Sequence, residues 1–227
     1  MTNEVTEVDV VICTPGSSLM IPYVKSFLAT IEELTKRGMR WAFSSEYSSH
    51  VADAREITAS GTYSNDINDS RPFHGKLKYK KLFWIDSDIA WTVEDFFKLY
   101  DSDKDIISGA YLLGNGEVTA YPQKLGRALT YTEVLEMKDP IKVHGTGFGF
   151  LAVKQGVFES LSRPWFQSAP VTMTDANTKQ EYTFPIMGED ISWCERVNNL
   201  GYEVWFDPTV KLTHHKTMKL TWEGIRP

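Results

Sequence analysis

Short apolar runs alternate with segments of helical periodicity along the first half of the chain, and this order restricts the possible folds most. Residues 8–14 form a β-branched apolar run that ends at Pro15-Gly16, as expected of a buried strand and a turn. Residues 19–37 then carry apolar side chains at helical spacing. Further strands are predicted at 39–44, 81–85 and 105–112, and further helices at 50–60 and 92–100. This alternation predicts an α/β fold, with a mainly parallel central sheet flanked by helices.

The pattern becomes irregular after residue 112. We expect a small β-ribbon at the sheet edge within residues 114–142, including the alternating residues 128–134. Strands are predicted at 148–153, 202–206 and 210–213, a short helix at 155–161 and a longer helix at 189–200. Residues 62–79 are predicted to form a polar loop. Residues 162–187 show little periodicity and form either an acceptor-side lid or a disordered insert.

Acidic residues outnumber basic ones, which argues against a protein that binds nucleic acid through its overall charge. The 227 residues include 24 Lys and Arg against 30 Asp and Glu, a net charge of −6. Positive charge is concentrated in one segment, at Arg71, Lys76, Lys78, Lys80 and Lys81. This segment is either a solvated surface or a local basic patch.

The cysteines and the start of the chain indicate a soluble protein of a reducing compartment. Cys13 and Cys194 lie in apolar segments, outside any metal-ligand spacing, and are predicted to be buried thiols. The first residues show no signal sequence, and no apolar stretch reaches the ~20 residues that span a bilayer. We therefore expect a cytoplasmic location.

The acidic turn Asp86-Ser87-Asp88 follows the apolar run 81–85 directly. In open α/β sheets, ligands bind beyond the carboxyl ends of the strands. Two carboxylates separated by one residue can reach the same hard cation, such as Mg²⁺ or Mn²⁺. The alternative is a pair that caps the helix predicted to start at Thr92.

Two further groups of ionisable residues lie near the end of the chain. Glu189 and Asp190 open the helix predicted at 189–200, where acids favour the first turn and a carboxylate can also act as a general base. His214 and His215 end the last extended segment. Imidazole is a common metal ligand, and a surface or supporting position is the alternative for this pair.

The acidic turn, the Glu189-Asp190 pair and the C-terminal histidines occur along the chain in the order found in one enzyme class. The chain resembles the GT-A-fold glycosyltransferases, in particular the inverting family-2 type and its relatives, from about residue 8 to residue 216. The resemblance rests on Thr14-Pro15, Ala54-Arg55, FWIDSD at 83–88, ISGAY at 107–111, GTGF at 145–148, Gly188-Glu189-Asp190, Gly201-Tyr202, Pro208 and His214. It implies a soluble, metal-dependent nucleotide-sugar glycosyltransferase of bacterial or viral type, in the cytoplasm or, if viral, the host cytoplasm.

The resemblance also implies a role for each matching residue. Asp88, with Asp86 and His214, would bind the divalent cation, Mn²⁺ or Mg²⁺. Asp190 would be the general base, with Glu189 as the less favoured choice. The residues assigned to the nucleotide-sugar donor are Thr14, Pro15, Arg55, Asp86, Gly109, His215 and Lys216. Those assigned to the sugars or the acceptor are Gly145, Gly147, Trp165 and Trp193.

The implied reaction moves a sugar from a nucleotide diphosphate sugar, by default a UDP-sugar, to a hydroxyl of a glycan or other acceptor, with inversion. One GT-A domain spans 1–227, with a nucleotide-binding half at about 8–112, an acceptor and catalytic half at about 113–216 and a tail at 217–227. The alternatives are a phage-type transferase acting on hydroxymethylated bases in DNA, a nucleotidyltransferase, or a non-catalytic sugar-nucleotide-binding module. The negative net charge disfavours DNA, and the set of Asp88, Asp190 and His214 disfavours the non-catalytic module.

Overall fold

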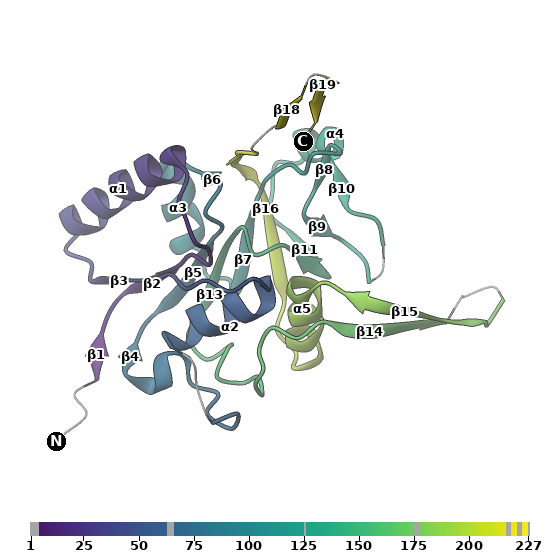
Figure 1. Cartoon of the computed structure of the whole chain (residues 1–227), viewed down its shortest axis with the longest axis horizontal. Helices are drawn as coiled ribbons and strands as arrows, with labels where there is room; N and C mark the ends of the chain where they lie inside the picture. Colours follow the sequence, from purple (N-terminus) through teal and green to yellow (C-terminus); the bar gives the residue numbers. More distant parts are fainter. Residues whose placement is uncertain are drawn as a thin grey trace.

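A seven-stranded sheet forms the centre of the molecule, in the order β11–β16–β7–β13–β5–β2–β3 (Figure 1). The computed structural model describes residues 5–62, 66–124, 126–174, 178–216, 219–221 and 224–226. The sheet strands are β2 (Val10–Cys13), β3 (Trp41–Ser44), β5 (Lys81–Ile85), β7 (Ile106–Ala110), β11 (Ile141–Val143), β13 (Phe150–Lys154) and β16 (Val204–Lys211). Only β11 and β13 run against the common direction of the others. The predicted mainly parallel α/β sheet is confirmed.

Helices cover both faces of this sheet (Figure 1). They are α1 (Ile21–Lys36), α2 (Val51–Ser60), α3 (Val93–Tyr100), α4 (Tyr131–Glu136) and α5 (Glu189–Asn199), with a short 3₁₀ helix η1 (Pro72–Gly75). Tyr23 of α1 and Phe96 of α3 share one buried apolar cluster with Phe83 of β5. Trp84, the next residue of β5, lies in a second cluster with Trp193 of α5. Successive strand residues point to opposite faces, so β5 supports both cores.

Most predicted elements are confirmed to within a few residues at their ends. The apolar period that predicts the helix at 19–37 corresponds to α1, and the cap predicted at Thr92 is present. The backbone N–H of Asp95 donates to the Thr92 hydroxyl at 3.1 Å, and the Asp95 carboxylate accepts from the Thr92 N–H at 2.9 Å. Cys13 and Cys194 are buried free thiols, as predicted. Within the described residues, no helix has the length and apolar character needed to cross a membrane.

Short strands pair outside the central sheet. They are β1 (Thr6–Glu7), β4 (Leu77–Lys78), β6 (Ile89–Ala90), β8 (Glu117–Val118), β9 (Ala120–Tyr121), β10 (Leu129–Thr130), β12 (Gly145–Thr146), β17 (Thr213–His214), β18 (Lys219–Thr221) and β19 (Gly224–Arg226). The antiparallel pair β6–β17 places His214 opposite Ile89. His214 is thereby held beside the acidic turn that precedes β6.

Three segments differ from the prediction. Residues 131–136 form the helix α4 where a ribbon strand was expected, because Thr130 and Glu133 make a capping box. Residues 155–161 form turns in place of a helix, with Gly156 at φ +100°. The predicted loop at 62–79 contains η1 and β4, and β4 pairs with β1.

The segment predicted as a lid or an insert forms a β-hairpin. Its strands are β14 (Ala169–Thr174) and β15 (Glu181–Met187), and the hairpin projects from the body of the molecule (Figure 1). Residues 175–177 lie outside the described residues. At the base, the N–H of Ala169 donates to the hydroxyl of Ser192 in α5 at 3.3 Å. The hairpin therefore leads directly into the start of α5.

Candidate active site

A cleft of about 550 Å³ opens where several sheet strands end. Asp86 follows β5, Pro15 lies just beyond β2, and Tyr111 follows β7. Glu189 and Asp190, at the start of α5, form another part of the wall. The cleft therefore lies beyond the carboxyl ends of the strands, where α/β sheets bind their ligands.

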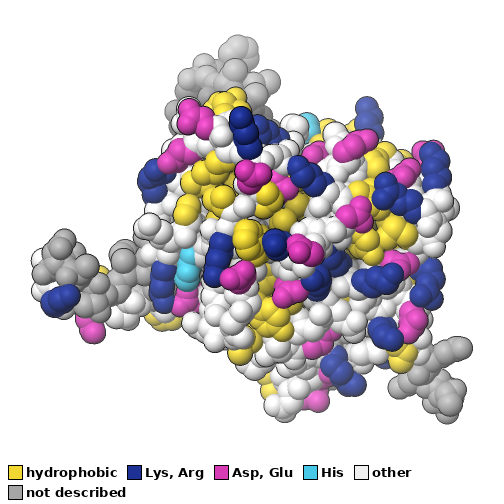
Figure 2. Space-filling model, turned by 180° about the vertical axis from the view of Figure 1, so that it is seen from behind, with side chains coloured by type: hydrophobic (Ala, Val, Ile, Leu, Met, Phe, Trp, Pro, Cys, Tyr) yellow, Lys and Arg dark blue, Asp and Glu magenta, His cyan; other side chains and the backbone are white. Residues whose placement is uncertain are grey.

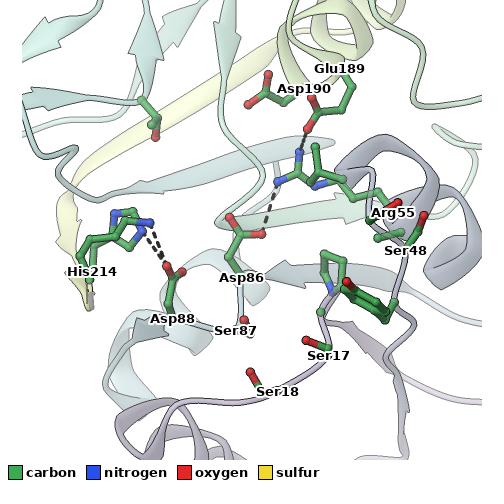
Figure 3. Close-up of a pocket in the computed structure, with 18 of the residues that line it drawn as sticks. Ser17, Ser18, Ser48, Arg55, Asp86, Ser87, Asp88, Glu189, Asp190 and His214 are labelled. Atoms are coloured by element: carbon green, nitrogen blue, oxygen red, sulfur yellow. Dashed lines mark hydrogen bonds and ion pairs between the residues drawn. The ribbon is translucent and has the colours of Figure 1, made fainter. Parts of the chain in front are cut away.

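The first aspartate of the acidic turn faces Arg55 of α2. Arg55 donates from one guanidinium nitrogen to Asp86 at 3.3 Å and forms an ion pair with Glu189 through another (Figure 3). The Arg55 side chain is only 6% exposed, so these two carboxylates balance a buried charge. Arg55 thereby links the turn after β5 to the start of α5.

The second aspartate of the turn faces the opposite side of the cleft, where His214 lies (Figure 3). Asp88 Oδ2 is 3.2 Å from His214 Nε2 and 2.9 Å from Lys216 Nζ. Burial disfavours the charged carboxylate, but the hydrogen bonds from His214 and Lys216 outweigh it and lower the pKa of Asp88 to about 2. Its hydrogen bond to Asp88 in turn raises the pKa of His214.

The geometry of His214 fits a metal ligand. His214 Nδ1 lies 2.8 Å from the carbonyl oxygen of Leu112, which can only accept, so Nδ1 carries a proton when it makes this bond. Nε2 faces the Asp88 carboxylate, so both ring nitrogens donate when both bonds are made. Release of the Nε2 proton would present its lone pair to a cation beside Asp88, the arrangement common for histidines that bind metals. No set of three or more His, Cys, Asp or Glu side chains gathers around one point in the described residues. One carboxylate and one imidazole suit a cation whose other ligands are water and substrate phosphates.

The two adjacent acids of α5 have different surroundings. Glu189 is held in the ion pair with Arg55, whereas the Asp190 carboxylate accepts a hydrogen bond from the N–H of Ile191 at 2.7 Å. Burial raises the pKa of Asp190, the charge of Arg55 opposes this rise, and the charge of Glu189 adds to it. Asp190 therefore has a greater affinity for a proton than an ordinary aspartate, as suits a general base.

Eight of the residues predicted for the site line this one cleft: Pro15, Arg55, Asp86, Asp88, Glu189, Asp190, His214 and Lys216. Three predicted donor residues do not line it. Thr14 is buried, with its hydroxyl 2.5 Å from that of Tyr23. Gly109 packs against Val210, and His215 meets the acidic turn through its backbone N–H, 2.8 Å from the carbonyl oxygen of Asp88.

The prediction that Trp165 and Trp193 face a sugar is wrong, because both side chains are fully buried. Each packs on Phe158, at ring-centroid distances of 5.7 and 5.2 Å, and the Trp165 indole N–H donates to the Phe158 carbonyl at 3.0 Å. Their burial in the apolar core leaves no ring face for a sugar.

Gly145 and Gly147 also fail to match their predicted role. A Cβ at Gly145 would lie 3.2 Å from the side chain of Ile191, and one at Gly147 would clash with the hydroxyl of Tyr111. Both glycines therefore permit close approach by the protein's own side chains.

The cleft also carries a rim of hydroxyl groups that was not predicted from the sequence: Ser17, Ser18, Tyr47, Ser48, Ser49, Ser87, Tyr111 and Thr119. Ser17 and Ser18 follow β2, and Ser48 and Ser49 follow β3. Their place after strand ends is the signal that could have identified them, since such ends meet at one edge of the sheet.

Of the two alternatives for residues 71–81, the structure favours a solvated surface over a basic patch, because most of these cations are paired. Arg71 lies 2.7 Å from Asp69, Lys78 lies 2.9 Å from Glu7 and Lys80 lies 2.7 Å from Asp9. Lys81 is buried, and its ammonium donates to backbone carbonyls. On the face shown in Figure 2, basic and acidic side chains are interspersed. A groove for DNA is not supported by these residues.

Comparison with known proteins bears on the fold. No family model and no curated protein matches the sequence. The crystal structure of A197 from STIV matches 94% of this chain and 97% of its own, with a TM-score of 0.53 and 18% identity. GalNAc-T7 with UDP, GalNAc and Mn²⁺ has a TM-score of 0.48 at 13% identity, over 94% of this chain and 44% of that chain.

The catalytic domain of Drosophila beta1,4galactosyltransferase 7 in complex with xylobiose has a TM-score of 0.49 at 12% identity, over 94% of this chain and 72% of that chain. At these identities the similarity concerns the fold alone. The A197 structure shows a shared fold over nearly the whole chain. The two structures with TM-scores below 0.5 carry no further argument.

Proposed function

We propose that this protein is an inverting, metal-dependent glycosyltransferase that takes its sugar from a nucleotide diphosphate sugar, with a UDP-sugar as the favoured donor. The observation that carries the proposal is the division of one cleft into two chemically different ends. Asp88 and His214 form one end, Asp190 forms the other, and Arg55 with Asp86 lies between them (Figure 3). Departure of a diphosphate and deprotonation of an acceptor need two such ends.

The end with Asp88 and His214 would receive the diphosphate. These two side chains would hold Mn²⁺ or Mg²⁺. The bound cation would neutralise the negative charge that develops on the leaving diphosphate. Lys216, 2.9 Å from Asp88, places an ammonium group at the same end. The hydroxyls of Ser17 and Ser18 border this part of the cleft and can donate to phosphate or ribose oxygens.

The end with Asp190 would receive the acceptor. The acceptor oxygen attacks the anomeric carbon, the bond from that carbon to the diphosphate oxygen breaks, and the acceptor proton passes to Asp190. The attack comes from the side opposite the leaving group, so the configuration inverts. Burial of Asp190 suits it to this role because it raises the affinity of the carboxylate for a proton.

The two halves of the single domain supply different ends of the cleft. Residues 8–112 contribute the acidic turn, Arg55 and the serine rim, which we assign to the donor. Residues 113–216 contribute Asp190 for the acceptor, and they also return His214 to the donor end through β17. The acceptor is a glycan or another compound with a free hydroxyl group.

The test is release of UDP from a panel of UDP-sugars with Mn²⁺ and a mixture of hydroxyl acceptors, for the wild type and for Asp190→Asn. We expect the substitution to lower the rate by about 10²- to 10⁴-fold and to leave the Kd for UDP within twofold, because Asp190 would act on the acceptor. An unchanged rate would contradict the assignment of Asp190. Release of pyrophosphate in place of UDP would identify a nucleotidyltransferase.

A further inference from the structure

Tyr111 lies between two parts of the site that distant segments of the chain supply. It follows β7 directly, it lines the cleft, and its residue surface is only 5% exposed. One of the two parts is the acidic turn after β5, and the other is His214 in β17. Tyr111 contacts His214 directly through its ring and reaches the acidic turn through its hydroxyl and Gly149.

The hydroxyl group of Tyr111 supports the acidic turn through Gly149. The backbone N–H of Gly149 donates to the Tyr111 hydroxyl at 3.1 Å. The carbonyl of the same glycine accepts from the N–H of Asp86 at 3.0 Å. The Tyr111 hydroxyl thus fixes the N–H of Gly149, and the carbonyl of Gly149 fixes the backbone of Asp86 at the start of the turn.

The loop before β13 is shaped around this tyrosine. A Cβ on Gly149 would lie 2.6 Å from the Cζ atom of Tyr111, closer than side-chain atoms approach. A Cβ on Gly147 would likewise clash with the hydroxyl oxygen of Tyr111. Glycine at both positions lets the backbone reach the hydroxyl, so the hydrogen bond to Gly149 depends on this close fit.

The aromatic ring of Tyr111 supports His214. The two rings meet edge to face, with centroids 5.4 Å apart and an interplanar angle of 86°. The next residue, Leu112, accepts the hydrogen bond from His214 Nδ1 at 2.8 Å. Two consecutive residues therefore fix the face of the imidazole and point Nε2 toward Asp88.

We propose that Tyr111 is a positioning residue that holds Asp86-Ser87-Asp88 and His214 in one fixed arrangement. The inference rests on the proposed function, because the two parts need a fixed separation when they share one cation and one diphosphate. Residues that orient metal ligands in this way typically change metal affinity 10- to 100-fold when they are altered, by an order-of-magnitude rule.

The first measurement is calorimetric titration of Mn²⁺ into the protein with UDP present. Tyr111→Phe removes the hydroxyl and keeps the ring, and Tyr79→Phe is the matched control. Tyr79 is likewise buried, donates to Glu159 at 2.9 Å and meets the ring of Phe73 edge to face, but it does not line the cleft. We expect Tyr111→Phe to raise the Kd for Mn²⁺ about tenfold and Tyr79→Phe to leave it unchanged. Equal Kd values for both variants would overturn the proposal.

The second measurement needs no ligand and separates this proposal from the proposed function. Amide hydrogen exchange of Asp86 is followed by NMR in the metal-free wild type and in both variants. We expect Tyr111→Phe to accelerate exchange at Asp86 about fivefold and Tyr79→Phe to leave it unchanged, since only the first loosens Gly149. Unchanged exchange at Asp86 in Tyr111→Phe would overturn the positioning role. A wild type that binds neither Mn²⁺ nor UDP would refute the proposed function, and exchange would then decide the role of Tyr111 alone.

Discussion

Asp190 and Glu189 are neighbours in the sequence, yet their carboxylates have opposite effects on stability. Asp190 is half-buried, and removal from water outweighs the nearby charge of Arg55, so its charged form is disfavoured in the folded state and its pKa is raised from 3.8. Glu189 is paired with the buried guanidinium of Arg55. The helix-start pattern predicts both acids, but only the position of Arg55 on α2 distinguishes them, and that depends on the fold.

Asp190→Asn is expected to raise the midpoint of thermal unfolding near neutral pH. A raised folded-state pKa means that ionised Asp190 costs stability at pH values above it, and that this cost disappears as the pH falls through that pKa. The gain from Asp190→Asn should therefore shrink as the pH is lowered. Calorimetric melts of both proteins over roughly pH 4 to 8 measure this, and a lower midpoint for the variant at neutral pH would contradict it.

Glu189→Gln should act in the opposite direction. The substitution removes one of the two carboxylates that pair with the Arg55 guanidinium, which is 6% exposed, and leaves the pair with Asp86. Loss of one partner from a buried ion pair typically costs about 3 kcal/mol of unfolding free energy. Urea denaturation compares the variant with the wild type, and a change below about 0.5 kcal/mol would show that the ion pair contributes little.

At the scale of elements, apolar periodicity predicts the central strands and the long helices because burial on one or both faces determines them. β5 is buried at every position, and α3 carries both its apolar stripe and its cap. The same reasoning misses α4, although Thr130 and Glu133 have the spacing of a capping box. It also misplaces Trp165 and Trp193, because an aromatic side chain in the sequence does not reveal whether it meets a sugar or the core.

Lys81 offers a test of how one element is terminated. Its buried ammonium donates to the carbonyls of Leu99, Tyr100 and Ser102 at 3.2, 2.6 and 2.7 Å, where α3 ends. Lys81→Met leaves these carbonyls without that donor and should lower the free energy of unfolding by about 2 kcal/mol. Lys80→Met is the matched control, because the Lys80 side chain is 73% exposed and its pair with Asp9 is worth less than about 1 kcal/mol. Equal losses in the two variants would contradict this account of the end of α3.

At the scale of the whole molecule, the sheet brings together residues that lie far apart in the sequence. The order of motifs predicts that Asp88 and His214 meet, and β6–β17 pairing places them at one end of the cleft. The serine rim and the position of Tyr111 depend on how the loops fold over the sheet edge, which no local pattern encodes. The sequence thus predicts most of the charged residues of a site that lies across the ends of several strands, but fewer of its neutral residues.

The most direct test of the central claim is thermal unfolding with UDP, with and without Mn²⁺, for the wild type and Asp88→Ala. A ligand at a hundredfold excess over its Kd stabilises the folded state by ~2.7 kcal/mol. We predict a higher unfolding midpoint with UDP only when Mn²⁺ is present, and loss of this shift in Asp88→Ala. An equal shift in the presence of a metal chelator, or no shift for the wild type with Mn²⁺ and UDP, would contradict a metal-dependent nucleotide site in this cleft.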